Sequence, residues 1–180
     1  KIAVMDKGRI IQTGEAADVL CRPADTVVAG LLGVENILPG RCLGRANGIL
    51  HVAIGDAVLA ARTAAAKGAV SVCIRAEDVA AMPPGREWAF SPRTWSGDWP
   101  AGGGGTAINR LMARVDAVTS LGPVYKATLD CGFPLVAYLT KREIRDLGIV
   151  FGSPVVAEIE AEAVHVLPAG ATRPAAEKGG

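Results

Sequence analysis

The clearest strand in this sequence is Tyr125-Lys126-Ala127-Thr128-Leu129-Asp130-Cys131. Its apolar and polar side chains alternate, and a period of two residues is typical of a β-strand with one buried face. Short apolar runs separated by turn residues recur along the chain, at 36–43, 48–54, 57–62, 69–75 and 135–139. This pattern predicts a mainly β fold, built as a small OB-like barrel of short strands.

The last part of the chain extends the same pattern. Apolar side chains on one face and Glu158, Glu160 and Glu162 on the other predict a single long strand over Val155–Leu167. Between the strands, Thr140-Lys141-Arg142-Glu143 matches a capping box, in which the threonine hydroxyl and the glutamate each bond the other's backbone. A short helix is therefore expected after Thr140.

The beginning of the chain has a different pattern. Residues 1–14 predict a β-hairpin that turns at Asp6-Lys7-Gly8. Two short helices are expected to follow, over Glu15–Cys21 and Ala24–Leu32, the second ending at Gly33.

Amino-acid composition indicates the character of the remaining segments and the boundaries between them. Three tryptophans and the run Gly102–Gly105 predict a flexible insert, and a polar tail rich in Ala, Pro and Gly predicts disorder at the end. The expected segments are 1–34, 35–84, the insert 85–106, 107–168 and the tail 169–180.

Bulk properties exclude several classes of protein. Hydrophobic residues make up 50% of the chain, which is enough for a core. The net charge of +1 and the lack of a Lys/Arg-rich run argue against a nucleic-acid partner. No apolar run reaches the roughly 20 residues that span a membrane. The four scattered cysteines form no CxxC pair, so we expect buried free thiols in a reducing compartment rather than a zinc site.

Several stretches resemble the ATP-binding subunits of ABC importers. Residues 2–14 and 19–23 resemble the end of their nucleotide-binding domain, and 28–40 resemble its continuation. Val72–Val79, which contains Arg75, Glu77 and Asp78, is similar to the signature of TOBE accessory domains, with Ala76 where proline is usual. The last third resembles the Mop-type domain of molybdate and tungstate importers. The resemblance covers nearly the whole chain except Arg86–Gly105 and the tail.

The resemblance implies a C-terminal accessory region of such a subunit, with a barrel of the TOBE/Mop type. It implies dimer contacts with a second copy, a regulatory role, and permease subunits as partners at the cytoplasmic face of the membrane. ATP and Mg²⁺ would be cofactors of the longer subunit, and no cofactor or metal is expected in this chain.

Enzymatic motifs are missing from the sequence. ATP hydrolysis needs a glycine-rich loop with a lysine that holds the phosphates, but Gly102–Gly105 is followed by Thr106 and has no such lysine. The Walker B carboxylates and the ABC signature are not found either. His51 and His165 both lie in predicted strands and are expected to be structural. The chain as given is therefore predicted not to be an ATPase, and no catalytic residue is assigned.

Oxyanion binding is the remaining chemical question. A bound dianion needs backbone N–H groups, hydroxyls and a Lys or Arg, which the resemblance places at Ser120, Thr140, Lys141 and Arg142. However, Glu143, Glu160 and Glu162 replace the serine, the lysine and the Ser/Thr of the Mop pattern. A carboxylate about 4 Å from an anion costs roughly 4 kcal/mol per pair of unit charges near a protein surface. A ligand-free dimerisation module is therefore favoured, with an oxyanion-sensing domain that inhibits transport as the alternative.

Overall fold

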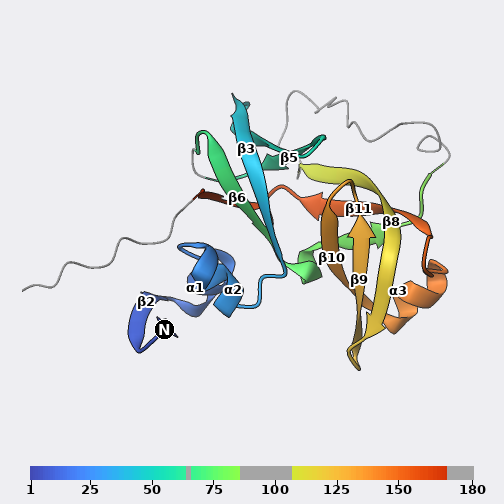
Figure 1. Cartoon of the computed structure of the whole chain (residues 1–180), viewed down its shortest axis with the longest axis horizontal. Coiled ribbons are helices and arrows are strands. Elements are labelled where there is room, and N and C mark those ends of the chain that lie inside the picture. The colour runs from blue at the N-terminus through green and yellow to red at the C-terminus, as the bar shows by residue number, and fades with distance from the viewer. Residues whose placement is uncertain (64–65, 86–106, 170–180) are drawn as a thin grey trace, which may run out of the picture.

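A computed structural model describes residues 1–63, 66–85 and 107–169. The chain begins with the expected hairpin and two helices (Figure 1), which are β1 (Ile2–Asp6), β2 (Arg9–Gly14), α1 (Ala16–Cys21) and α2 (Thr26–Leu31). The hairpin turn needs positive φ at both Lys7 and Gly8 (46° and 76°). The side chain of Asp25 accepts a hydrogen bond from the N–H of Val28 (2.8 Å) and so caps α2.

The remaining strands form two antiparallel sheets of five strands each. The first sheet has the order β12-β6-β3-β4-β5 and the second the order β10-β9-β8-β11-β7. Their bounds are β3 (Asn36–Ala46), β4 (Ile49–Ile54), β5 (Ala57–Ala61), β6 (Ala69–Ile74), β7 (Ala80–Met82), β8 (Ile108–Ser120), β9 (Val124–Asp130), β10 (Pro134–Thr140), β11 (Pro154–Glu160) and β12 (His165–Pro168). The 3-10 turn η1 (Ala76–Asp78) and the helix α3 (Lys141–Asp146) complete the described elements. The mainly β prediction is confirmed, although these sheets close no barrel among the described strands.

The two sheets are built from two copies of one strand arrangement. In each sheet a long strand (β3 or β8) lies at the centre, between its hairpin partner (β4 or β9) and a later strand (β6 or β11). Each central strand also has a bulge, between Cys42 and Gly44 in β3 and between Val115 and Ala117 in β8. The last strand of each copy is exchanged: β7 joins the second sheet and β12 joins the first. The sequence segments 35–84 and 107–168 therefore contribute to both sheets.

The predicted single strand over Val155–Leu167 is wrong. The chain turns at 161–163 and passes from the second sheet into the first. The backbone of the fully buried Ala161 bonds other segments, donating to the carbonyl of Ala107 (2.7 Å) and accepting from the N–H of Arg62 (2.8 Å). The alternation of buried and exposed residues continues through this turn, with Ala161 buried and Glu162 exposed, so periodicity cannot reveal the break.

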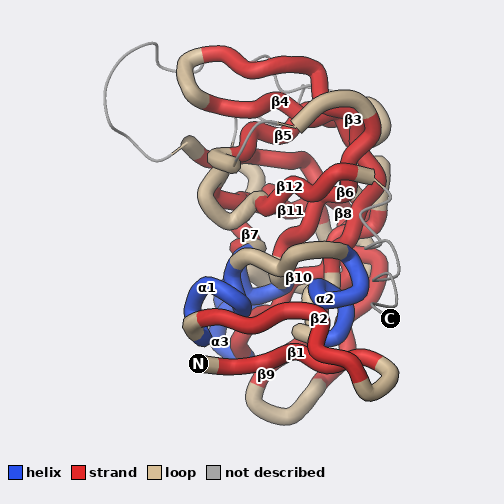
Figure 2. Tube along the Cα trace, turned by 90° about the vertical axis from the view of Figure 1, so that its left-hand side faces the viewer, coloured by secondary structure: helices blue, strands red, loops and turns tan. Residues whose placement is uncertain are grey.

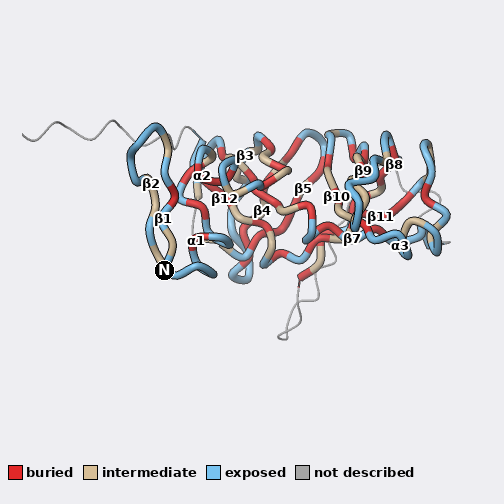
Figure 3. Tube along the Cα trace, turned by 90° about the horizontal axis from the view of Figure 1, so that it is seen from below, coloured by how far each residue is buried: buried red, intermediate tan, exposed pale blue. Residues whose placement is uncertain are grey.

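One apolar cluster spans both sheets, with members such as Leu59 and Val72 in the first and Leu129 and Ile159 in the second. Figure 3 shows buried residues along both sheets, and Figure 2 shows α1 and α2 in the N-terminal segment and α3 further along the chain. No helix in the described ranges is long and apolar enough to cross a membrane.

The four cysteines are free thiols in different environments. Cys73 and Cys131 are buried as expected, and burial raises the pKa of their thiols to about 11 and about 12. Cys42 is half-buried and its thiol donates to the carbonyl of Ala66 (3.0 Å). Cys21 is exposed, contrary to the expectation, because it ends α1 on the solvent side. Apart from Gly85 and Ala169, the predicted insert and the predicted tail lie outside the described residues.

Candidate functional site

The four predicted oxyanion contacts lie at one end of the second sheet. Ser120 ends β8 opposite Tyr125, and Thr140 ends β10 opposite Val124, so β9 begins between them. Since adjacent strands are about 4.8 Å apart, Ser120 and Thr140 are separated by roughly two strand spacings. Lys141 and Arg142 follow as the first residues of α3. All four side chains are exposed, and we call them, with the turn 121–123, the Ser120–Thr140 end.

A carboxylate already occupies the donors of Thr140. Glu143 Oε2 accepts hydrogen bonds from both the backbone N–H and the hydroxyl of Thr140, each at 2.7 Å. The N–H of Glu143 lies 3.2 Å from Thr140 Oγ1, which completes the predicted capping box. The hydroxyl and backbone bonds from Thr140 lower the pKa of Glu143, so its carboxylate stays ionised at neutral pH. An anion at this position would have to displace a like charge.

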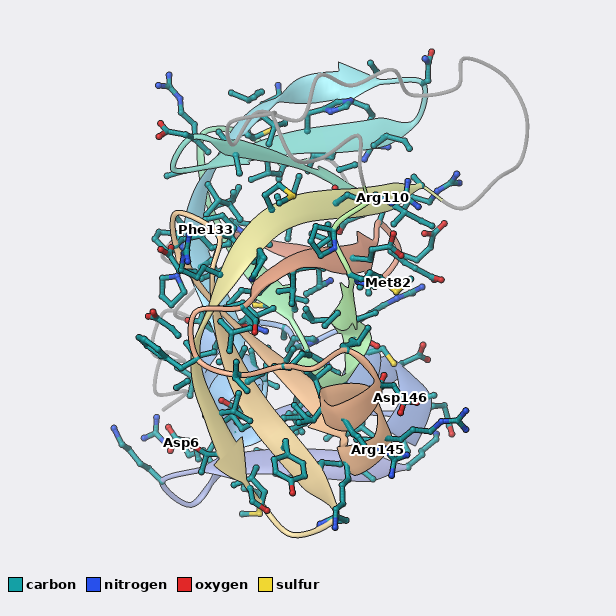
Figure 4. The ribbon with its side chains drawn as sticks, turned by 90° about the vertical axis from the view of Figure 1, so that its right-hand side faces the viewer. Asp6, Met82, Arg110, Phe133, Arg145 and Asp146 are labelled. Carbon is teal, nitrogen blue, oxygen red and sulfur yellow. The ribbon has the colours of Figure 1, made fainter. Side chains whose placement is uncertain are left out.

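Arg142, one of the two cationic groups of this end, is itself paired. Arg142 Nε lies 3.2 Å from Asp146 Oδ2, one turn further along α3, and Arg145 Nε lies 3.3 Å from the other oxygen of Asp146. Figure 4 shows Arg145 and Asp146 side by side on this helix. Exposed pairs of this kind are weak, and they leave part of the positive charge of α3 available.

The other two glutamates lie elsewhere. Glu160 is opposite Ile108, at the first residue of β8, whereas Ser120 is the last residue of that strand. Glu162 forms an ion pair with Arg62 (2.9 Å), beside the first sheet. Figure 4 shows the same separation, with Arg110 near the start of β8 and Arg145 on α3 far apart. Within one chain, therefore, the structure does not bring Glu160 and Glu162 together with the Ser120–Thr140 end.

A second feature is an acidic cavity of about 360 Å³ between η1, β7 and β11. Its lining residues are Glu77, Asp78, Ala80, Ile108, Glu158, Ile159, Glu160 and Ala163. Burial, and then the negative charge of Glu77, raise the pKa of Asp78, and the positive charge of Arg75 opposes them. Arg110 Nε lies 2.5 Å from Glu158 Oε1 at the edge of this group. The net lining charge is negative, so the cavity disfavours anions.

The signature arginine has a docking role that the sequence did not indicate. The guanidinium of Arg75 donates to the carbonyl of Leu20 in α1 (2.7 Å) and pairs with Glu77 (3.2 Å). In the neighbouring strand β12, the imidazole Nε2 of His165 lies 3.1 Å from the carbonyl of Pro23. Both contacts attach the end of α1 to the first sheet. The carbonyl of Leu20 lies in the last turn of α1, where carbonyls lack a partner within the helix, and so a side-chain donor stabilises it.

Comparison with curated sequences identifies relatives over most of the chain, although no protein-family model matches it. The molybdate/tungstate import ATP-binding protein WtpC of Pyrococcus horikoshii is 32% identical over 171 residues, which are 93% of this chain and 42% of that protein. The sulfate/thiosulfate import ATP-binding protein CysA 2 of Chromobacterium violaceum is 32% identical over 130 residues, which are 72% of this chain and 29% of that protein. The chain thus spans less than half the length of these relatives.

Among solved structures, the chain is similar to the cytoplasmic molybdate-binding protein ModG in a molybdate-bound crystal form. The TM-score is 0.53 at 20% sequence identity, and the match covers 76% of this chain and 97% of ModG. At this level of identity the likeness establishes a shared fold.

Proposed function

Since this chain is homologous to part of the ATP-binding subunits of molybdate/tungstate importers, we propose that it is the accessory region of such a subunit. In this proposal it joins two subunits and regulates transport, and ATP is hydrolysed by other parts of the longer protein, where ATP and Mg²⁺ bind. Its partners are a second copy and the permease subunits, at the cytoplasmic side of the membrane. The alignment over 93% of the chain supports this assignment.

We further propose that the region works without a bound oxyanion. The observation behind this is the ionised carboxylate of Glu143 on both donors of Thr140, where an anion would need to bind. Glu160 lies at the other end of β8 and Glu162 pairs with Arg62, so within one chain neither of these carboxylates contacts this position.

An oxyanion-sensing role is the second candidate. It is favoured by the fold shared with ModG, a molybdate-binding protein, and by the gathering of Ser120, Thr140, Lys141 and Arg142 at one sheet end. The two candidates differ in whether the native chain binds the anion at all.

Calorimetric titration of the chain with molybdate, tungstate and sulfate separates them. We expect no binding heat for the native chain up to millimolar anion. Glu143→Ser removes the carboxylate and frees the donors of Thr140, so any molybdate affinity is expected to rise at least ~10-fold. Glu15→Ser is the matched control, with the same change of net charge in the exposed residue before α1. Micromolar binding by the native chain would overturn the ligand-free proposal in favour of the sensor.

The joining role predicts a dimer in solution, which light scattering coupled to size exclusion measures directly. We expect twice the chain mass of 18.5 kDa at about 100 µM protein, a concentration at which weak interfaces are populated. Because β7 and β12 already pair within one chain, we do not expect the dimer to form by exchange of these two strands. A mass of 18.5 kDa at this concentration would contradict dimerisation through this region alone.

A further inference from the structure

The residues between α2 and β3 contact the second sheet directly. Glu35 Oε1 accepts a hydrogen bond from the hydroxyl of Tyr138 in β10 (2.6 Å), and Oε2 accepts one from Nζ of Lys126 in β9 (2.9 Å). Tyr138 and Lys126 lie directly opposite each other in the β9–β10 register. Both hydrogen bonds lower the pKa of Glu35, so its carboxylate is held charged between the two strands.

The next residue reinforces this attachment. Asn36 is buried, and its Oδ1 accepts from the N–H of Val136 (2.6 Å) while its Nδ2 donates to the Val136 carbonyl (2.9 Å). The same Nδ2 reaches the carbonyl of Ile74 in the first sheet (3.1 Å). Glu35 and Asn36 are therefore bound along one strand, β10, which ends at Thr140.

The distance from Glu35 to the Ser120–Thr140 end is short. Tyr138 and Thr140 are two residues apart on β10 and face the same side of the sheet, so their Cα atoms are separated by roughly 7 Å. Lys126 and Val124 have the same relation on β9. The Glu35 contact thus lies one residue pair away from the predicted oxyanion contacts.

Residues 32–35, which link α2 to β3, are also bonded to α2. The N–H of Val34 donates to the carbonyl of Ala29 (3.0 Å), and both side chains are buried in one cluster with Cys73 and Leu167. Cys73 and Leu167 belong to strands of the first sheet, so α2 contacts that sheet through apolar packing, whereas α1 is fixed to it by the guanidinium of Arg75.

We propose that Glu35 is a positioning residue that couples the placement of α2 to the order of the Ser120–Thr140 end and α3. A shift of the N-terminal segment changes the constraint on Lys126 and Tyr138, and through them the last residues of β10 and the cap of α3. Such coupling goes beyond the proposed accessory function, because it supplies a route by which one part of the chain regulates another. It concerns a single chain without ligand, so its failure would leave the joining role untouched.

Amide hydrogen exchange, followed by mass spectrometry on the whole chain, tests the coupling. Asp25→Ala removes the cap of α2, and loss of such a cap is expected to raise exchange in residues 26–34 about fivefold. With Glu35 present, we expect exchange in residues 120–124 and 141–147 to rise at least twofold as well, since the constraint is relaxed. In the Asp25→Ala/Glu35→Ala double variant, compared with Glu35→Ala alone, this distant rise is expected to vanish while the rise in 26–34 persists.

The control variant is Arg75→Gln, which removes one of the two contacts that attach the end of α1 to the first sheet and leaves Glu35 in place. In the Arg75→Gln background, Asp25→Ala is still expected to raise exchange in residues 120–124 and 141–147. An equal distant response with and without Glu35, or none in the chain with native Glu35, would overturn the proposal. If Asp25→Ala unfolds the N-terminal segment, Asp25→Gly repeats the comparison with a milder loss of the cap, of about twofold in exchange.

Discussion

Replacing Asn109 by alanine is expected to lower the free energy of unfolding by about 3–5 kcal/mol, because it leaves several buried backbone groups without partners. Asn109 is 6% exposed, and its Oδ1 accepts from the N–H of Ala60 in β5 (2.7 Å). Its Nδ2 donates to the carbonyls of Ala60 (3.0 Å) and Ile159 (3.2 Å). The side-chain amide of Asn109, on the central strand of the second sheet, thus gives hydrogen-bond partners to the backbone of an edge strand of the first sheet.

Urea unfolding followed by far-UV circular dichroism measures this loss. The neighbouring variant Arg110→Ala is the control, because it removes an exposed ion pair with Glu158 from the same strand and is expected to cost less than about 1 kcal/mol. A loss for Asn109→Ala no larger than that of Arg110→Ala would show that the amide is not a structural link between the sheets. Asn36 makes the corresponding contacts to Val136 and Ile74, so the same reasoning applies to it.

Leu129→Ala is expected to cost about 3–4 kcal/mol, within the range for removing a buried leucine side chain that leaves a cavity. Leu129 is fully buried in β9 and belongs to the apolar cluster that spans both sheets. The two sheets also each contain one strand of the other copy, so neither can unfold and leave the other complete. We therefore expect β4 in the first sheet and β9 in the second to lose protection in one transition, shifted equally by the substitution.

Residue-resolved hydrogen exchange under increasing denaturant checks this expectation. Leu43→Ala is the control, since Leu43 is 58% exposed in β3 and its truncation is expected to change stability by no more than ~0.5 kcal/mol. Loss of protection in β9 alone, with β4 unaffected, would indicate two independent domains. Such a result would support the predicted separation into segments 35–84 and 107–168. The exchange of β7 and β12 between the sheets argues against that separation.

Periodicity and cap patterns predicted much of the local structure. The hairpin, the two N-terminal helices, the strands between 36 and 75 and the helix after Thr140 all occur where their residues indicated. The capping box of Thr140 and Glu143 was predictable because its two bonds join residues three positions apart.

Other elements had no usable local signal. β7 has three residues, which is too short for a period of two to be recognised. β8 has a polar residue, Asn109, on its buried face, where alternation alone would require an apolar one. The docking role of Arg75 depends on α1, 55 residues earlier in the chain.

The sequence by itself determined the short strands and the caps, since these depend on neighbouring residues. It also gave the carboxylates at positions 143, 160 and 162 by residue identity alone. Only the tertiary structure decided which sheet each strand joins, because many apolar strands of similar length can pair and distant packing selects among them. That choice sends β11 and β12 to different sheets and places Glu160 at the opposite end of β8 from Ser120. It leaves Glu143 as the one of the three carboxylates that directly meets the predicted oxyanion contacts.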